Sequence, residues 1–232
     1  MDGSETTTTP RRIEQRLIAV GSGEAALEGS LRRPASPLGV VLRVTVGARR
    51  EPSPDAEPMA AALLDVPLAV AEVELLTRWE ETLDHFSGRL RYDVELLSGR
   101  ISQAILALRA EPDLAALPFG VLAQGTLVAA TLLAVAREPE LARAIVSLEG
   151  RADLVRPHLP AVHAPTLLLV DADDEPVLDL TVGALCRLGA PAEVLVLPFE
   201  ARPETARGRE EVGRLAGDWF RHHLPADAVP AA

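Results

Sequence analysis

The 232-residue chain contains no lysine and no asparagine, and it has one cysteine and few aromatic residues (3%). With Cys186 alone, neither a disulfide within the chain nor a cysteine-based metal site can form. Because 48% of the residues are hydrophobic and so few are aromatic, alanine, valine and leucine must fill the core. Arginine is the only strongly basic residue type, and a GC-rich coding bias explains this more simply than function does.

Clusters of basic residues interleaved with aromatics are also missing, and the net charge is −11. This balance argues against a nucleic-acid partner and for a surface that repels its own copies. The polar N-terminal residues 1–14 lack the apolar core of a signal peptide. We therefore expect disordered tails at 1–14 and 225–232, one domain over 15–224, and a cytoplasmic protein.

An uncharged stretch, Leu117–Ala136, lies at the centre of the chain. It predicts a buried strand over Pro118–Ala123, a tight turn over Gln124–Thr126 and a buried helix to about Ala136. The polar turn interrupts the stretch, so we expect no membrane span. In an open α/β sheet such a strand lies centrally, and chemistry gathers just beyond its carboxyl end.

The rest of the chain alternates between short apolar runs and longer amphipathic segments, which predicts parallel strands joined by helices. Two alternating runs, Arg16–Val20 and Ala26–Arg33, predict an antiparallel hairpin at a sheet edge. The segment Thr77–Arg89 fits either a loop or an exposed helix. Further strands are expected at Leu38–Val46, Leu68–Leu75, Ala144–Leu148, Thr166–Val170 and Glu193–Leu197, and further helices at Ala56–Leu64, Tyr92–Arg109, Val177–Leu188 and Arg207–His223.

Several different short motifs follow one another in a characteristic order along residues 16–224. They are Leu75-Leu76-Thr77, Arg91-Tyr92-Asp93-Val94, Leu117-Pro118, Ala144-Ile145-Val146-Ser147, Gly150-Arg151-Ala152-Asp153-Leu154, Ala164-Pro165-Thr166-Leu167-Leu168, Asp174-Glu175-Pro176-Val177 and Asp218-Trp219-Phe220. In this order the chain resembles the dienelactone-hydrolase-like branch of the α/β-hydrolases. The resemblance implies a three-layer α/β-hydrolase fold, with a mostly parallel central sheet flanked by helices and an antiparallel N-terminal hairpin.

The resemblance also implies three catalytic positions. The nucleophile position of the family falls on Gly125, the acid position on Asp174 and the histidine position on Arg202. The family's oxyanion loop falls on Thr45-Val46, where a His-Gly pair is usual. Glycine has no side chain with which to attack, and arginine stays protonated near neutral pH, so it cannot accept a proton. A degenerate triad, and hence a pseudoenzyme, is the interpretation we draw.

Three classes of function stay open, because fold alone does not fix function. The first is a binding protein for a small molecule or a protein partner. The second is an enzyme that uses the cleft without a covalent step, such as a lyase, cyclase or isomerase. The third is a hydrolase with a relocated nucleophile, for which Thr126, Cys186 and Ser147 are the alternatives, although capping suits Thr126 and burial suits Cys186 better.

The expected binding residues surround the turn, and we predict no metal and no cofactor. Asp171, Asp173 and Asp174 could attract a cation, but acids in a strand-end loop are usually only solvated. Arg202 is expected to form an ion pair with Asp174, replacing the family's histidine–acid pair. A homodimer is possible through the stripe of the last helix or the first hairpin. The binding set comprises Thr45, Val46, Gln124, Thr126 and His85.

Overall fold

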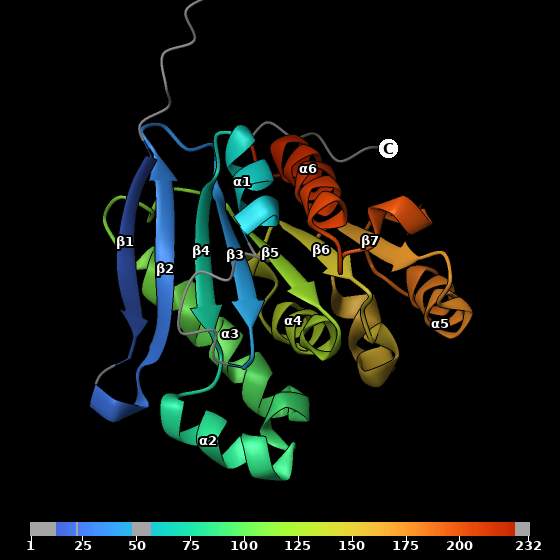
Figure 1. The fold of residues 1–232 in the computed structure, drawn as a ribbon, viewed down its shortest axis with the longest axis horizontal. Coiled ribbons are helices and arrows are strands. Elements are labelled where there is room, and N and C mark those ends of the chain that lie inside the picture. The colour runs from blue at the N-terminus through green and yellow to red at the C-terminus, as the bar shows by residue number, and fades with distance from the viewer. Residues whose placement is uncertain (1–12, 22, 48–56, 226–232) are drawn as a thin grey trace, which may run out of the picture.

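The computed structural model describes residues 13–21, 23–47 and 57–225. Eight strands form one sheet in the order β1-β2-β4-β3-β5-β6-β7-β8. β2 pairs antiparallel with both β1 and β4, and the six strands from β4 to β8 run parallel to one another (Figure 1). The predicted hairpin and parallel sheet are thus confirmed. The strands are β1 (Ile13–Val20), β2 (Leu27–Pro34), β3 (Val40–Thr45), β4 (Ala69–Glu74), β5 (Phe119–Gln124), β6 (Ala144–Leu148), β7 (Thr166–Asp171) and β8 (Ala192–Leu197).

Helices cover both faces of the sheet, which makes three layers. α1 and α6 pack against each other on one face, and α3 and α4 pack together on the other (Figure 1). The α-helices are α1 (Glu57–Asp65), α2 (Arg78–Ser87), α3 (Val94–Arg109), α4 (Thr126–Arg137), α5 (Glu175–Leu185) and α6 (Ala206–His223). The short 3₁₀ segments are η1 (Gly23–Ala25), η2 (Leu90–Tyr92), η3 (Pro139–Leu141), η4 (Ala152–Ala161) and η5 (Phe199–Ala201).

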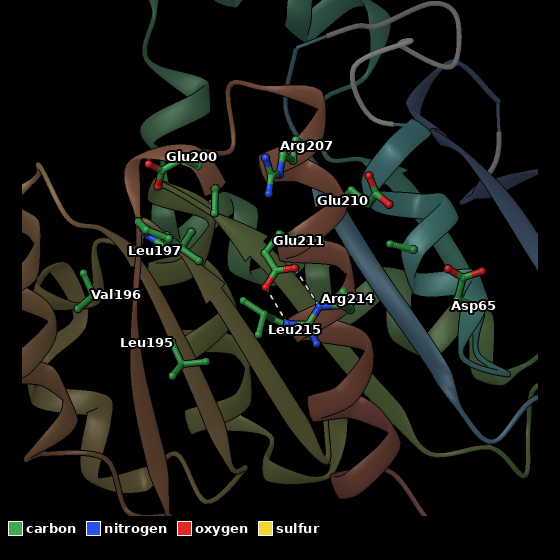
Figure 2. Close-up of a pocket in the computed structure, with 13 residues that line it drawn as sticks. Asp65, Leu195, Val196, Leu197, Glu200, Arg207, Glu210, Glu211, Arg214 and Leu215 are labelled. Carbon is green, nitrogen blue, oxygen red and sulfur yellow. Dashed lines mark hydrogen bonds and ion pairs between the residues drawn. The ribbon is translucent and has the colours of Figure 1, made fainter.

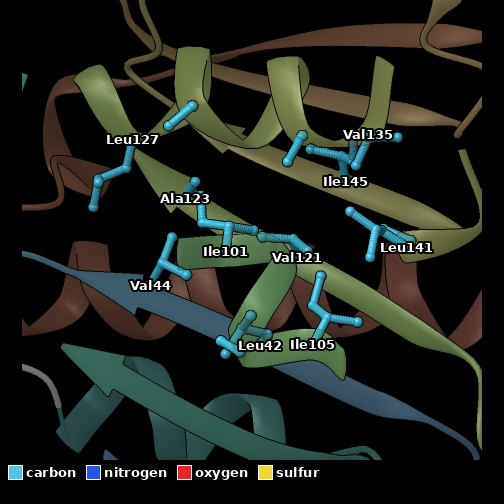
Figure 3. Packing of buried hydrophobic residues seen from close by; sticks show 14 of the residues in the cluster. Leu42, Val44, Ile101, Ile105, Val121, Ala123, Leu127, Val135, Leu141 and Ile145 are labelled. Carbon is cyan, nitrogen blue, oxygen red and sulfur yellow. The ribbon is translucent and has the colours of Figure 1, made fainter. Parts of the chain in front are cut away.

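The alternation of side chains along the strands divides the core in two. On β3, Leu42 and Val44 join the cluster beneath α3 and α4, whereas Val41 joins the cluster beneath α1 and α6. Figure 3 shows the first cluster, in which Ile101 and Ile105 of α3 lie beside these strand residues. Because β5 is covered on both faces, its sequence is continuously apolar from Phe119 to Ala123 rather than alternating.

Some elements differ from their sequence-based boundaries. The ambiguous segment Thr77–Arg89 contains the helix α2 (Arg78–Ser87), and the proline-rich connection after β6 contains the 3₁₀ segment η4. α5 ends at Leu185, so Cys186 follows the helix and is exposed; the expectation of a buried thiol is wrong. β1 already begins at Ile13. Of the two expected tails, residues 1–12 and 226–232 lie outside the described residues.

The stripe of α6 proposed as a dimer surface is part of the core. Val212, Ala216 and Phe220 are fully buried, and α6 packs along α1. The apolar stripe is therefore used within the subunit. Among the described helices, none combines the length and apolar character that crossing a membrane requires.

Candidate functional site

A sharp bend joins β5 to α4 at Gly125, which has φ 61° and ψ −129°. The Gly125 amide donates a hydrogen bond to the carbonyl of Leu148 at 3.0 Å, and its carbonyl accepts one from the Arg151 amide at 3.3 Å. Residues with side chains rarely adopt positive φ. A Cβ atom added at Gly125 would meet nothing within 4 Å. The bend thus has the shape of a strand-to-helix elbow with open space above it.

Glu149 lies beside this bend, directly after β6, and sequence reasoning missed it. Its carboxylate accepts a hydrogen bond from Nε2 of Gln124 at 3.1 Å, and its amide donates to the carbonyl of Leu169 at 2.8 Å. Its φ of 49° is the one positive value among the described non-glycine residues. Such backbone conformations are concentrated at functional sites. The available signal was an acidic residue placed immediately after the strand that neighbours β5.

Burial is the main reason that the pKa of Glu149 is raised above its ordinary value of 4.5. The hydrogen bond from Gln124 opposes this rise, whereas the carboxylates of Glu204, Asp171 and Asp174 add to it. These neighbours come from the segment before α6, the end of β7 and the start of α5. Acidic groups from several elements therefore converge next to the bend.

Arg202 belongs to this same corner but has different partners from those expected. Its Nε lies 3.2 Å from Oδ2 of Asp171, and its Nη2 forms a close ion pair with Asp173. Asp174 instead caps α5, accepting a hydrogen bond from the Val177 amide at 3.1 Å. A capping side chain must turn back towards its own helix. The expected pairing of Arg202 with Asp174 is therefore corrected to one with Asp171 and Asp173.

Thr45 and Val46 follow β3, the strand next to β5. The Thr45 hydroxyl donates a 2.6 Å hydrogen bond to Glu74, at the end of β4, and Val46 packs against the core. Burial raises the pKa of Glu74, with further contributions from Glu81 and Glu72 that the Thr45 hydrogen bond opposes. The side chain of Thr45 is thus engaged with a neighbouring carboxylate.

The elbow between β5 and α4 contains Gln124, Gly125 and Thr126, whereas His85 lies on α2. Thr126 is the first residue of α4, and Gly125 occupies the N-cap position before it. His85 is exposed on α2, where its ring meets that of Phe86 edge-on at 5.5 Å. This ring contact of His85 is therefore made within α2.

A separate hollow of about 760 Å³ lies between β8 and α6. Leu195 and Leu197 of β8 line one side, and Arg207, Glu211 and Arg214 of α6 line the other (Figure 2). Arg214 and Glu211 pair with each other at 2.7 Å within this lining. Neither Gly125 nor Glu149 lines this hollow. Within 13–21, 23–47 and 57–225, no three histidine, cysteine or acidic residues are grouped so as to hold a metal.

The parallel sheet, the elbow after its central strand and the helices on both faces define the α/β-hydrolase fold. A dienelactone hydrolase from Anabaena variabilis ATCC 29413 is 34% identical, with a TM-score of 0.84, and the match covers 91% of this chain and 99% of that one. The chain belongs to the dienelactone hydrolase family. No family model matches it.

More distant structures share the fold alone. A dienelactone hydrolase-like promiscuous phosphotriesterase from metagenomic libraries has a TM-score of 0.66 at 17% identity, covering 91% of this chain and 99% of that one.

Two Mycobacterium tuberculosis proteins, each named "Putative phosphoribosyl transferase", are 32% identical over 216 residues. This match covers 93% of the present chain but only 47% of theirs, so the chain spans about half the length of these relatives.

The conformation of the elbow predicts opposite effects for two glycine-to-alanine substitutions. Neither Gly125 nor Gly99 has an atom within 4 Å of an added Cβ, but only Gly125 has positive φ. Gly125→Ala should lower the free energy of unfolding by about 1–3 kcal/mol. Gly99→Ala, in the middle of α3, should raise it by about 0.5–1 kcal/mol. Urea unfolding of both variants measures the difference, and equal effects would refute a strained bend at Gly125.

The raised pKa of Glu149 predicts a stability change with a defined sign. The folded protein holds this proton more tightly than the unfolded chain, so the free energy of unfolding falls as pH rises from about 4.5 through the folded pKa. In the Glu149→Gln variant the side chain at this position is neutral at every pH, so the variant does not undergo this fall in the free energy of unfolding. Relative to the wild type, it should therefore gain stability between about pH 4 and about pH 7. Urea unfolding at both pH values tests this, with exposed Glu140→Gln as the control that should show no such gain.

Proposed function

We propose that this chain binds a small molecule at the elbow without attacking it covalently. The observation that supports this most directly is Gly125 at the point of the bend, where acyl transfer would require a reactive side chain. Arg202, to which the sequence resemblance assigns the family's histidine position, forms ion pairs with Asp171 and Asp173. A guanidinium cannot serve as a base near neutral pH. Loss of the nucleophile or its base costs about a millionfold in kcat.

Relocation of the nucleophile finds little support. Cys186 is exposed beyond the end of α5, and Ser147 is 1% exposed beneath the backbone of Gly150. A Cβ added at Gly150 would lie 2.3 Å from Oγ of Ser147, which indicates how tightly this hydroxyl is enclosed. Thr126 begins α4 beside the elbow but lacks a histidine partner among the hydrogen bonds of the described residues. Activation of a hydroxyl or thiol needs a base within hydrogen-bond reach.

The charges around the elbow favour a neutral or cationic ligand. Burial raises the pKa of Glu149, and the nearby carboxylates of Glu204 and Asp174 raise it further. Arg202 is already paired with two other carboxylates. A carboxylate ligand would meet this negative field without a free guanidinium to bind it. A lactone or an ester carries no net charge, and the family name points to the same class of molecule.

We propose no phosphoribosyl transferase activity for this chain. Those proteins are about twice as long, and the matched half corresponds here to an eight-stranded α/β-hydrolase sheet. A phosphoribosyl transferase activity would also have to bind a pyrophosphate group. The acidic corner at the elbow opposes such an anion.

Glu149 favours a second candidate, an enzyme that transfers a proton without forming a covalent bond to its substrate. A carboxylate with a raised pKa accepts a proton more readily than an ordinary carboxylate, which suits it to proton transfer. Glu149 also has an orienting hydrogen bond from Gln124 and an unusual backbone conformation. Isomerisation or elimination would use these features, whereas simple binding would not require them.

Ligand charge and covalent labelling together test the proposed function. We expect a lactone and the matching amino alcohol to raise the melting temperature, and the ring-opened hydroxy acid of the same skeleton to leave it unchanged. We also expect no stable labelling by a fluorophosphonate, because no serine is activated. A lactone-derived product that disappears in Glu149→Gln but persists in Glu140→Gln would favour the proton-transfer enzyme instead. Labelling that is lost in Thr126→Ala or Cys186→Ala would overturn the proposal.

A further inference from the structure

Helix α2 presents its apolar side to solvent and its acidic side to the protein. Trp79, Leu83 and Phe86 are 69%, 46% and 83% exposed, whereas Asp84 is 1% exposed. The three apolar residues are spaced i, i+4 and i+7, so they form one stripe along the helix. A surface helix usually buries its apolar stripe and exposes its charges. This helix does the reverse.

The polar contacts on its inner side hold α2 firmly in this orientation. Thr77 and Glu80 form a reciprocal capping box, and Glu80 also forms an ion pair with Arg100 of α3. This ion pair and the cap lower the pKa of Glu80 to about 2. Asp84 accepts a hydrogen bond from the Leu90 amide at 2.6 Å and pairs with Arg91. The exposed stripe is therefore a feature of a fixed helix.

The exposed stripe contains a large share of the chain's aromatic residues. The sequence has only two tryptophans, one tyrosine and four phenylalanines. Trp79 and Phe86 lie in the stripe, and Tyr92, just beyond it in η2, is 64% exposed. Exposed apolar patches of this kind commonly mark interfaces, in which aromatic residues are enriched.

We propose that the stripe Trp79–Leu83–Phe86 binds the same stripe of a second copy, with the two α2 helices antiparallel about a two-fold axis near Leu83. A large aromatic residue stands at each end of the stripe with leucine between them, so the pattern reads nearly the same in both directions. In this arrangement Trp79 of one copy meets Phe86 of the other. A two-fold interface must be self-complementary in just this way.

The helix dipoles favour an antiparallel pair, because antiparallel packing places the positive N-terminal end of one α2 beside the negative C-terminal end of the other. Three charged side chains of α2 do not oppose this packing, since they are paired within the subunit: Glu80 with Arg100, Asp84 with Arg91 and Arg78 with Glu28.

The size of the patch predicts a weak dimer. Large aromatic side chains bury on the order of 150–250 Å² each, so three large side chains from each copy give at most about 900–1,500 Å². Stable interfaces bury about 1,200–2,000 Å². Each chain also has a net charge of −11, so two copies repel at low ionic strength. Added salt should therefore strengthen the association.

Sedimentation velocity over a wide concentration range, at low and high salt, tests the proposal on the full chain. We expect a monomer–dimer equilibrium that salt favours, and an affinity at least about tenfold weaker in Leu83→Glu and in Phe86→Glu. Leu106→Glu is the matched control, because Leu106 is 51% exposed on α3 outside the stripe. Unchanged circular dichroism and unfolding midpoints confirm that each variant is folded.

Disulfide trapping tests the position of the two-fold axis. In a Cys186→Ser background, Leu83→Cys should form a disulfide-linked dimer on oxidation, and Leu106→Cys should not. A wild-type chain that stays monomeric at every concentration and salt level would overturn the proposal. A dimer that Leu83→Glu leaves intact would also overturn it, because the interface would then lie elsewhere.

Discussion

The bend at Gly125 is the constraint on which the site depends. The hydrogen bond from its amide to Leu148 ties the end of β5 to the end of β6, and the Arg151 amide closes the same junction from the other side. These bonds hold the backbone at positive φ, which glycine tolerates far better than other residues. The elbow of the fold is therefore preserved by backbone contacts that do not require a nucleophilic side chain.

The carboxyl ends of β6 and β7 bring the acidic groups to this elbow. Parallel strands end at one edge of the sheet, so Glu149, Asp171 and the cap of α5 come together from distant parts of the sequence. Arg202 offsets part of this charge, and burial leaves the Glu149 carboxyl easier to protonate. This corner of the structure thus contains a carboxyl group with a raised pKa and an arginine held in ion pairs.

The sequence predicts the fold well because periodicity and turn residues report on backbone and burial. The uninterrupted apolar run of β5, the hairpin and the strong stripe of α3 all appear as expected. Side-chain partners were harder to predict. Asp171, Asp173 and Asp174 are adjacent in sequence, and only the start of α5 at Glu175 decides which of them becomes the cap. Glu149 was missed because its importance comes from burial beside Gln124. α2 was ambiguous because its apolar stripe faces solvent.

We propose that the elbow geometry persists in this chain without the chemical groups for acyl transfer. Restoring both groups in Gly125→Ser/Arg202→His tests this most directly, with fluorophosphonate labelling as the measurement. The account predicts that the double variant is labelled at the serine introduced in the elbow and that the wild type and each single variant are not, because a nucleophile needs its base. Labelling of the wild-type chain, or of Arg202→His alone, would contradict it.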